Sequence, residues 1–214
     1  MPYPSRELRF VPEDRLYEFV WEATQLAAMI SGGGLAAANT RFGNGSSVFV
    51  SPLLDSVLCL PLTAAVEHCV RDLRPLSIAI EIGWPPGWTP PPPDPENEGG
   101  PSQFYNLYNN AGSVAFVNFY EGHKSWIKDR FGDKVSQWPS LFQFAWLVRN
   151  CASHGGRVHF FEWLPFFRCE WQGLSYSRDN NGDLVIGETM FFPEMVILMI
   201  EVGDEIDRLE LAAA

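Results

Sequence analysis

The amino-acid sequence predicts a mainly α-helical fold, and three observations lead to this expectation. Apolar residues recur every three or four positions over long segments, as they do along the buried face of an amphipathic helix. Cap and turn signals such as Ser31-Gly32-Gly33-Gly34 and Trp138-Pro139-Ser140 separate these segments. Only residues 170–187 alternate apolar and polar side chains as a pair of strands does. We therefore expect an antiparallel helical bundle with a small β-hairpin before its last helix.

The first half of the chain contains two predicted helices. Pro12-Glu13-Asp14 opens the first, whose apolar positions extend from 16 to 30, and the three glycines that follow are expected to end it because glycine is costly in a helix. The stretch from there to Ser51 is rich in Gly, Asn and Ser and is expected to be a loop. A second helix is predicted from Ser51-Pro52 to Cys69.

A proline-rich and acidic segment separates the two halves of the chain. Residues 84–93 contain a run of prolines that fits neither a helix nor a central strand, and residues 94–100 continue it with acidic residues and glycine. The sequence therefore predicts an insertion loop over residues 83–101. The whole chain, residues 1–214, is expected to form a single helical domain around this insertion.

Helical patterning resumes after the insertion. Helices are expected over residues 103–108 and 116–131, again from Leu141 onward, and finally over 193–211. The string Asp179-Asn180-Asn181-Gly182-Asp183 is a turn signal and is expected to join the two strands of the hairpin. Although its acidic residues resemble a calcium loop, the downstream glutamate of such a loop is missing.

The composition limits the classes of function. Hydrophobic residues make up 46% of the 214 residues and aromatic residues 14%, which is typical of a folded protein. The formal net charge of -11 argues against broad, non-specific adhesion to nucleic acid or to an anionic membrane, and neither DNA nor a membrane is an expected partner. The four cysteines form no C-x-x-C pair, so neither a structural metal site nor a cofactor is expected. The start of the chain lacks the apolar core of a signal peptide, and a cytoplasmic location is expected.

One stretch concentrates the side chains that could carry chemistry. It runs from Arg149 through Asn150 to His154 and ends in Gly155-Gly156, after the helix-like apolar run 141–148. The planar guanidinium group of an arginine can donate two hydrogen bonds to phosphate oxygens, and a histidine can give or take a proton near neutral pH. The negative end of a helix dipole is expected to favour the charged imidazolium of His154. Asn150 could orient either group or bind the phosphate.

The spacing of this stretch sets a condition on its function. Residues 149 and 154 lie roughly 140° apart around an ideal helix, so one straight helix does not aim both side chains at one point. They converge if the helix loosens at its glycine end or if two copies meet across a dimer axis. Other histidines are weaker candidates. His68 is expected to be exposed or packed, His123 to lie on a surface turn, and His159 to be a core or edge residue.

The string Arg149-Asn150-x-x-x-His154 resembles the signature of the HEPN superfamily, in which four to six residues separate an arginine, often followed by a polar residue, from a histidine. The resemblance covers about fifteen residues together with the order of the expected helices. It implies a HEPN-like helical bundle that forms a homodimer, with a metal-independent endoribonuclease site in the cleft between the copies. It also implies that the 2′-hydroxyl of RNA attacks the adjacent phosphate, with His154 as acid and base, Arg149 as charge stabiliser and Asn150 as polar assistant.

Further expectations follow from the same resemblance. RNA is the implied substrate, and toxins or antiphage effectors are common in the family, so an antitoxin or another defence-system protein is an implied partner. Two alternatives remain open. One is a catalytically silent HEPN-like module that binds a protein or nucleotide ligand. The other is an ordinary helix end, in which Arg149 and His154 only neutralise the dipole and cap carbonyl groups.

Overall fold

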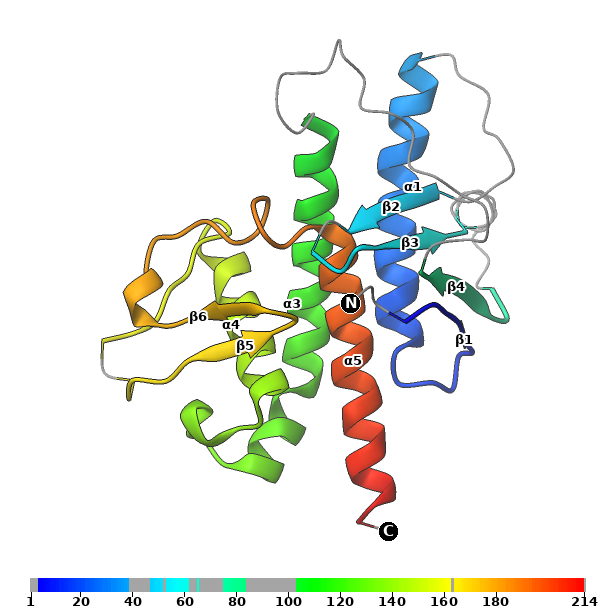
Figure 1. The fold of residues 1–214 in the computed structure, drawn as a ribbon. Helices are drawn as coiled ribbons and strands as arrows, with labels where there is room; N and C mark the ends of the chain where they lie inside the picture. Colours follow the sequence, from blue (N-terminus) through cyan, green and yellow to red (C-terminus); the bar gives the residue numbers. More distant parts are fainter. Residues whose placement is uncertain are drawn as a thin grey trace. The chain divides into compact units, whose positions relative to one another are not determined.

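The structure is a computed structural model of the whole chain, in which residues 4–38, 47–51, 53–61, 65, 75–83, 103–162 and 164–213 are described (Figure 1). The chain divides into two compact units, Met1–Ala111 and Gly112–Ala214. Apart from Gly83, the insertion expected over residues 83–101 lies outside the described residues. His68 and most of the second half of the helix predicted at 51–69 also lie outside them.

The first unit is built on a four-stranded antiparallel sheet. Its strands are β1 (Arg6–Phe10), β2 (Ser47–Ser51), β3 (Ser56–Leu60) and β4 (Ile78–Ile82). Their order across the sheet is β1-β4-β3-β2. In the central pair Leu58 lies opposite Ile82, and in the edge pair Leu8 lies opposite Ile80.

This sheet shows that the prediction of a mainly α-helical bundle is wrong, since the chain combines helices with two antiparallel sheets. The segment read as the start of a second helix forms β3, and part of the expected loop before it forms β2. The reason is physical. A short run such as Ser56–Leu60, which is almost wholly buried, shows neither a helical nor a strand period. The strand signal in Ile78–Ile82 is clearer, because three β-branched isoleucines alternate with Ala79 and Glu81.

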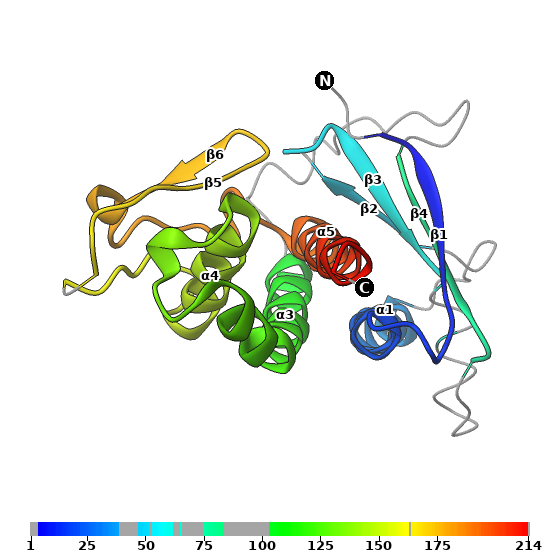
Figure 2. The same cartoon turned by 90° about the horizontal axis from the view of Figure 1, so that it is seen from below.

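The helix of the first unit, α1, spans Tyr17–Ala38. It begins close to the predicted position but continues through the three glycines that were expected to end it, so that prediction is wrong. The α1 helix lies along one face of the sheet (Figure 2), and the hydroxyl of Tyr17 donates a hydrogen bond to the carbonyl of Pro75 just before β4. This contact ties the helix to the sheet at the helix's first turn.

The second unit is mostly helical. It contains the larger part of α3 (Gln103–Phe131), the short 3-10 turn η1 (Val135–Gln137), α4 (Ser140–Ser153) and α5 (Phe192–Leu211). Between α4 and α5 lie the hairpin strands β5 (Cys169–Trp171) and β6 (Leu174–Tyr176) and a second 3-10 turn, η2 (Arg178–Asn180). The helices expected at 103–108 and 116–131 form one continuous helix, and those expected from Leu141 and at 193–211 are confirmed.

Aromatic side chains fix α4 within this unit. The ring of Phe142 lies 5.0 Å from that of Phe131 at the end of α3, and the ring of Phe144 lies 5.5 Å from that of Trp171 in β5. On α3, Gly112 allows a close approach, because a Cβ atom there would lie 2.6 Å from the terminal methyl of Met195 on α5. The core side chains of the unit therefore hold the axis of α4 in place along its whole length.

A two-stranded hairpin forms close to the expected place, from Cys169 to Tyr176, but its turn is elsewhere. It turns at Gln172-Gly173, where both residues have positive φ as a type I′ turn requires. The string Asp179–Asp183 instead begins within η2, and it forms hydrogen bonds with residues 158 and 160. This difference matters for the candidate site, because the segment bound by this string contains His159.

Candidate functional site

The candidate site lies at the C-terminal half of α4, within the second unit. Arg149 and Asn150 are on the last two turns of the helix, and His154 is its C-terminal cap residue. Gly155 and Gly156 follow with φ values of 66° and 80°, and the Gly156 amide donates a hydrogen bond to the Cys151 carbonyl at 2.8 Å. This is the six-to-one bond of a Schellman ending. The helix therefore ends in an ordered reversal of the backbone and not in a loosened last turn.

Arg149 is held by a carboxylate of α3. Its Nε donates to Glu121 Oε1 at 2.7 Å, and its Nη2 approaches the same oxygen at 2.7 Å. Lys124 also contacts Glu121, at 3.0 Å from Nζ to Oε2. Burial opposes the charge on Glu121, but the hydrogen bonds from Lys124 and Arg149 outweigh it and lower the pKa of the carboxyl group. Arg149 is therefore positioned by an ionised neighbour.

Asn150 has a free donor in a buried position. Its side chain is only 3% exposed, and Arg149 Nη1 donates to its Oδ1 at 3.4 Å. Because a guanidinium can only donate, the oxygen of the amide must face Arg149 and the nitrogen must face away. Among the described residues Nδ2 has no hydrogen-bond partner. An unpaired buried donor costs free energy, so an arriving acceptor would be favoured here.

His154 does not stand alone at the end of α4. Its ring lies parallel to that of His159, with 4.0 Å between the ring centroids and 22° between the planes. The ring of Phe161 stands perpendicular to that of His159, with 4.9 Å between the two centroids. Sequence reasoning had placed His159 in the core or at a strand edge, and the structure places it, half-buried, against the predicted catalytic residue.

The surroundings of His154 favour its neutral form. Partial desolvation lowers the pKa of the imidazole below its usual 6.5, and the nearby His159 and Arg149 lower it further. The expectation that the helix dipole holds this residue as imidazolium is therefore not met. Since Arg149 affects this pKa, the two motif residues lie close enough in one chain to interact electrostatically, despite their offset around the helix.

A network of backbone bonds presents His159 to His154. The side chain of Asn181 clasps the neighbouring peptide, since its Oδ1 accepts from the Phe160 amide at 2.7 Å and its Nδ2 donates to the Phe160 carbonyl at 3.0 Å. Val158 exchanges two more backbone bonds with the same turn, one with Asp183 and one with Gly182. The turn 179–183 therefore fixes the extended segment that runs back from the glycine pair.

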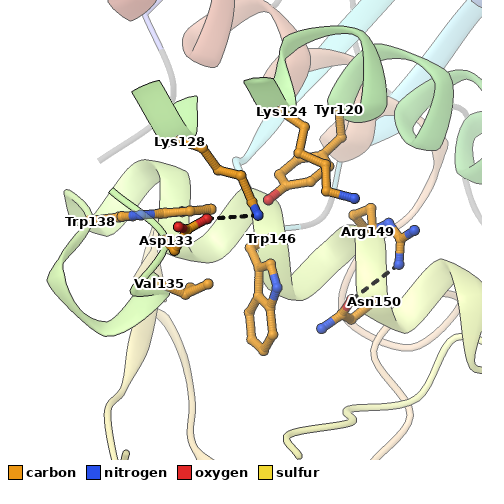
Figure 3. Close-up of a pocket in the computed structure, with 9 residues that line it drawn as sticks. All are labelled: Tyr120, Lys124, Lys128, Asp133, Val135, Trp138, Trp146, Arg149 and Asn150. Atoms are coloured by element: carbon orange, nitrogen blue, oxygen red, sulfur yellow. Dashed lines mark hydrogen bonds and ion pairs between the residues drawn. The ribbon is translucent and has the colours of Figure 1, made fainter. Parts of the chain in front are cut away.

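A pocket opens on the other side of Arg149, between α3, η1 and α4 (Figure 3). Its volume is about 210 Å³. The lining side chains are three cations, one carboxylate, a phenol, an amide and three apolar residues: Lys124, Lys128, Arg149, Asp133, Tyr120, Asn150, Val135, Trp138 and Trp146. Asp133 binds Lys128 at 2.9 Å. The three cations face two carboxylates, Asp133 and the neighbouring Glu121, so the pocket has a local net charge of +1. The chain as a whole has a net charge of -11.

Tyr120 supplies a second neutral donor to this pocket. Burial raises the pKa of its phenol, the negative charge of Glu121 raises it further, and Arg149 offsets only a part. The hydroxyl group therefore keeps its proton throughout the physiological range. Figure 3 shows it directed into the same space as the ammonium groups of Lys124 and Lys128.

The structure thus brings the three predicted residues to one end of α4 but not to one point. Arg149 lies between two sites: the pocket, which includes Asn150, and the histidine pair, which includes His154. Sequence reasoning missed His159, Tyr120, Lys124 and Lys128. A period-two alternation in Val158-His159-Phe160, after a glycine pair that reverses the chain, was the one available signal for His159. Among the other histidines, His123 is buried on α3 and not on a surface turn, with Nδ1 2.8 Å from the Phe119 carbonyl oxygen.

No group of three or more His, Cys, Asp or Glu side chains in the described part of the chain is arranged to hold a metal ion. Likewise, no helix in the described segments combines the length and the apolar character needed to cross a bilayer. Comparison with known protein families, with curated proteins and with solved structures finds no match for this chain.

Proposed function

We propose that this protein is an endoribonuclease that cleaves RNA without a metal ion, by attack of a 2′-hydroxyl on the adjacent phosphate. The observation that carries the proposal is the stacked pair of His154 and His159 at the end of α4, next to Arg149. The proposal uses the local resemblance of the Arg-Asn-x-x-x-His string to the HEPN signature and does not depend on the HEPN fold.

The histidine pair suits a reaction that needs one base and one acid. Two imidazoles 4.0 Å apart repel each other when both are charged, so the contact disfavours the doubly charged pair. In the proposed reaction His154, whose pKa is lowered, takes the proton of the 2′-hydroxyl. His159 gives a proton to the leaving 5′-oxygen. The bond from phosphorus to the 2′-oxygen forms, the bond to the 5′-oxygen breaks, and the products are a 2′,3′-cyclic phosphate and a 5′-hydroxyl end.

Arg149 and Asn150 would act on the phosphate. The charge that builds up on the non-bridging oxygens needs fixed donors, and Arg149 is already oriented by Glu121. Asn150 accepts a hydrogen bond from Nη1 of Arg149 at 3.4 Å and helps to orient the guanidinium group. Both groups are in place before substrate arrives, which reduces the reorganisation that the reaction requires.

The test is cleavage of a labelled single-stranded RNA by the full chain in the presence of EDTA. We expect cleavage with cyclic-phosphate ends, a loss of about 10²–10⁴ in rate for His154→Ala, and a loss of about 10²–10³ for Arg149→Ala. Glu188→Gln, at an exposed position elsewhere in the same unit, is the control and should keep the wild-type rate. The proposal fails if the wild-type chain does not cleave RNA, or if both variants cleave as fast as it does.

A second candidate is a module that binds RNA and does not cleave it. The observation that favours it is the ion pair of Arg149 with Glu121, which occupies part of the guanidinium fork. In the same assay this candidate predicts RNA binding by the wild-type chain, no cleavage product, and weaker binding for Arg149→Ala.

The proposal includes a homodimer, as the HEPN resemblance implies. Phe161, which contacts His159, is 37% exposed, and Phe166 in the same loop is 63% exposed. Apolar side chains of this size on a surface are suited to an interface between copies. Sedimentation equilibrium of the purified chain tests this part, and a monomer over the micromolar range would contradict it.

A further inference from the structure

We propose that the pocket between α3, η1 and α4 is a subsite that binds one nucleotide of a single-stranded RNA, through its phosphate group and its base. This inference rests on the proposed function. It deepens that function by naming where the RNA strand next to the cleaved bond lies. It stands on the lining of the pocket, on the orphan donor of Asn150, and on the position of Arg149.

The pocket selects for an acceptor-rich, negatively charged group. Its polar lining consists of donors, namely the three cations, the protonated phenol of Tyr120 and Nδ2 of Asn150. The one carboxylate of the lining, Asp133, is paired with Lys128 at 2.9 Å. A phosphate has several acceptor oxygens and carries charge, so it satisfies the ammonium groups and the unpartnered amide together.

The apolar part of the lining points to a flat ring beside that phosphate. Trp146 is half-buried and lies one helical turn before Asn150, so both side chains are on one face of α4. Its other contacts are the rings of Phe160 at 5.6 Å and Phe167 at 5.9 Å, which hold the indole in place. Bases of single-stranded RNA stack on aromatic side chains held in this manner.

The size of the pocket favours one unit of a polymer. Its volume of about 210 Å³ is below the range of roughly 300–1,000 Å³ that drug-sized ligands occupy. Arg149 belongs both to this lining and to the surroundings of His154. A nucleotide bound here would therefore place the next phosphate of the strand toward the histidine pair.

The test measures binding by calorimetry in the His154→Ala background, where no cleavage consumes the ligand. The probes are inorganic phosphate, uridine 5′-monophosphate and a short oligouridylate. We expect the monophosphate to bind more tightly than inorganic phosphate and the oligomer more tightly still. Tyr120→Phe, which removes only the hydroxyl group, and Lys128→Ala should each weaken binding of the monophosphate about tenfold. Lys134→Ala, an exposed lysine outside the pocket, is the matched control and should have no effect.

The outcomes separate this inference from the proposed function. Equal binding of the monophosphate by Tyr120→Phe, Lys128→Ala and the parent overturns the subsite, as does inorganic phosphate that binds as tightly as the monophosphate. Weaker binding in both variants, with no cleavage by the chain that retains His154, supports the subsite and overturns the ribonuclease. In a chain that cleaves RNA, the two variants should raise KM about tenfold with kcat unchanged, and an unchanged KM overturns the subsite alone.

Discussion

The imidazole rings of His154 and His159 are stacked with their centroids 4.0 Å apart, although one ends a helix and the other lies in an extended segment. Through this contact His159 helps to lower the pKa of His154. It also gives the end of α4 a property that a simple helix cap does not need. A cap is served by a charged imidazolium near the terminal carbonyls, whereas the pKa of His154 is lowered.

The first prediction concerns this coupling. His159→Phe keeps an aromatic ring against His154 but removes the charge that can repel its proton, so the pKa of His154 should rise toward 6.5. Desolvation, the larger cause of the lowered pKa, remains, so the rise should be partial. The measurement is NMR titration of the His154 ring protons between pH 4.5 and pH 8. A pKa that does not move, or that falls, would show that the two rings are not coupled in solution.

A second prediction concerns the carboxylate that holds Arg149. Glu121→Gln removes a negative charge shared by Arg149 and Lys124, and the local charge of the pocket rises by one. Binding of single-stranded RNA to the His154→Ala chain should become tighter, and the slope of log K against log salt should steepen by roughly 0.7. Glu188→Gln, an exposed change elsewhere in the same unit, serves as the control for net charge. Weaker RNA binding by Glu121→Gln would contradict this prediction. It would mean that Glu121 aids RNA binding by positioning Arg149 more than it opposes binding through its negative charge.

The helices of the second unit could be predicted because each carries a long apolar period and a clear boundary. Trp138-Pro139-Ser140 marks the start of α4, and Gly155-Gly156 marks its end. In the first unit the strands are five residues long, and β2 lies directly after a stretch rich in Gly, Asn and Ser. The short strands β2 and β3 give no clear period, and β1 pairs with β4, which lies far away in the sequence. The sheet order therefore could not be derived from local patterns.

The site was predictable only where it is local in sequence. Arg149, Asn150 and His154 stand within six residues, and their types alone indicated phosphate chemistry. His159 reaches His154 because the backbone reverses at two positive φ angles and because Asn181, some twenty residues further on, binds the returning segment. Lys124 and Lys128 reach the pocket from α3 through the packing of two helices. Such contacts depend on tertiary structure, which spacing in the sequence does not encode.

A third prediction concerns the clasp made by Asn181. Asn181→Ala removes two hydrogen bonds to the Phe160 peptide and should lower the free energy of unfolding by about 1–3 kcal/mol. Asn181→Asp keeps the acceptor for the Phe160 amide but loses the donor, so its effect should be smaller. Both variants should also lower the cleavage rate, since the clasp presents His159. Thermal unfolding and the RNA assay together provide the measurement, and a destabilised variant with full activity at low temperature would show that His159 takes no part.

The last prediction compares the two glycines that end α4. Both have positive φ, so alanine is strained at either position by roughly 1–2 kcal/mol. A Cβ atom on Gly155 would meet nothing within 4 Å, whereas a Cβ atom on Gly156 would lie 2.9 Å from the Ile186 carbonyl oxygen. The Gly156 carbonyl also accepts the backbone amides of Val185 and Ile186, so this contact cannot relax without displacing residues 185 and 186, which follow the turn that holds the His159 segment. Gly155→Ala should lower the midpoint of thermal unfolding by about 2–6 °C with little loss of activity. Gly156→Ala should lower it at least twice as far and should also reduce cleavage, and equal shifts for the two variants would show that this close approach is absent in solution.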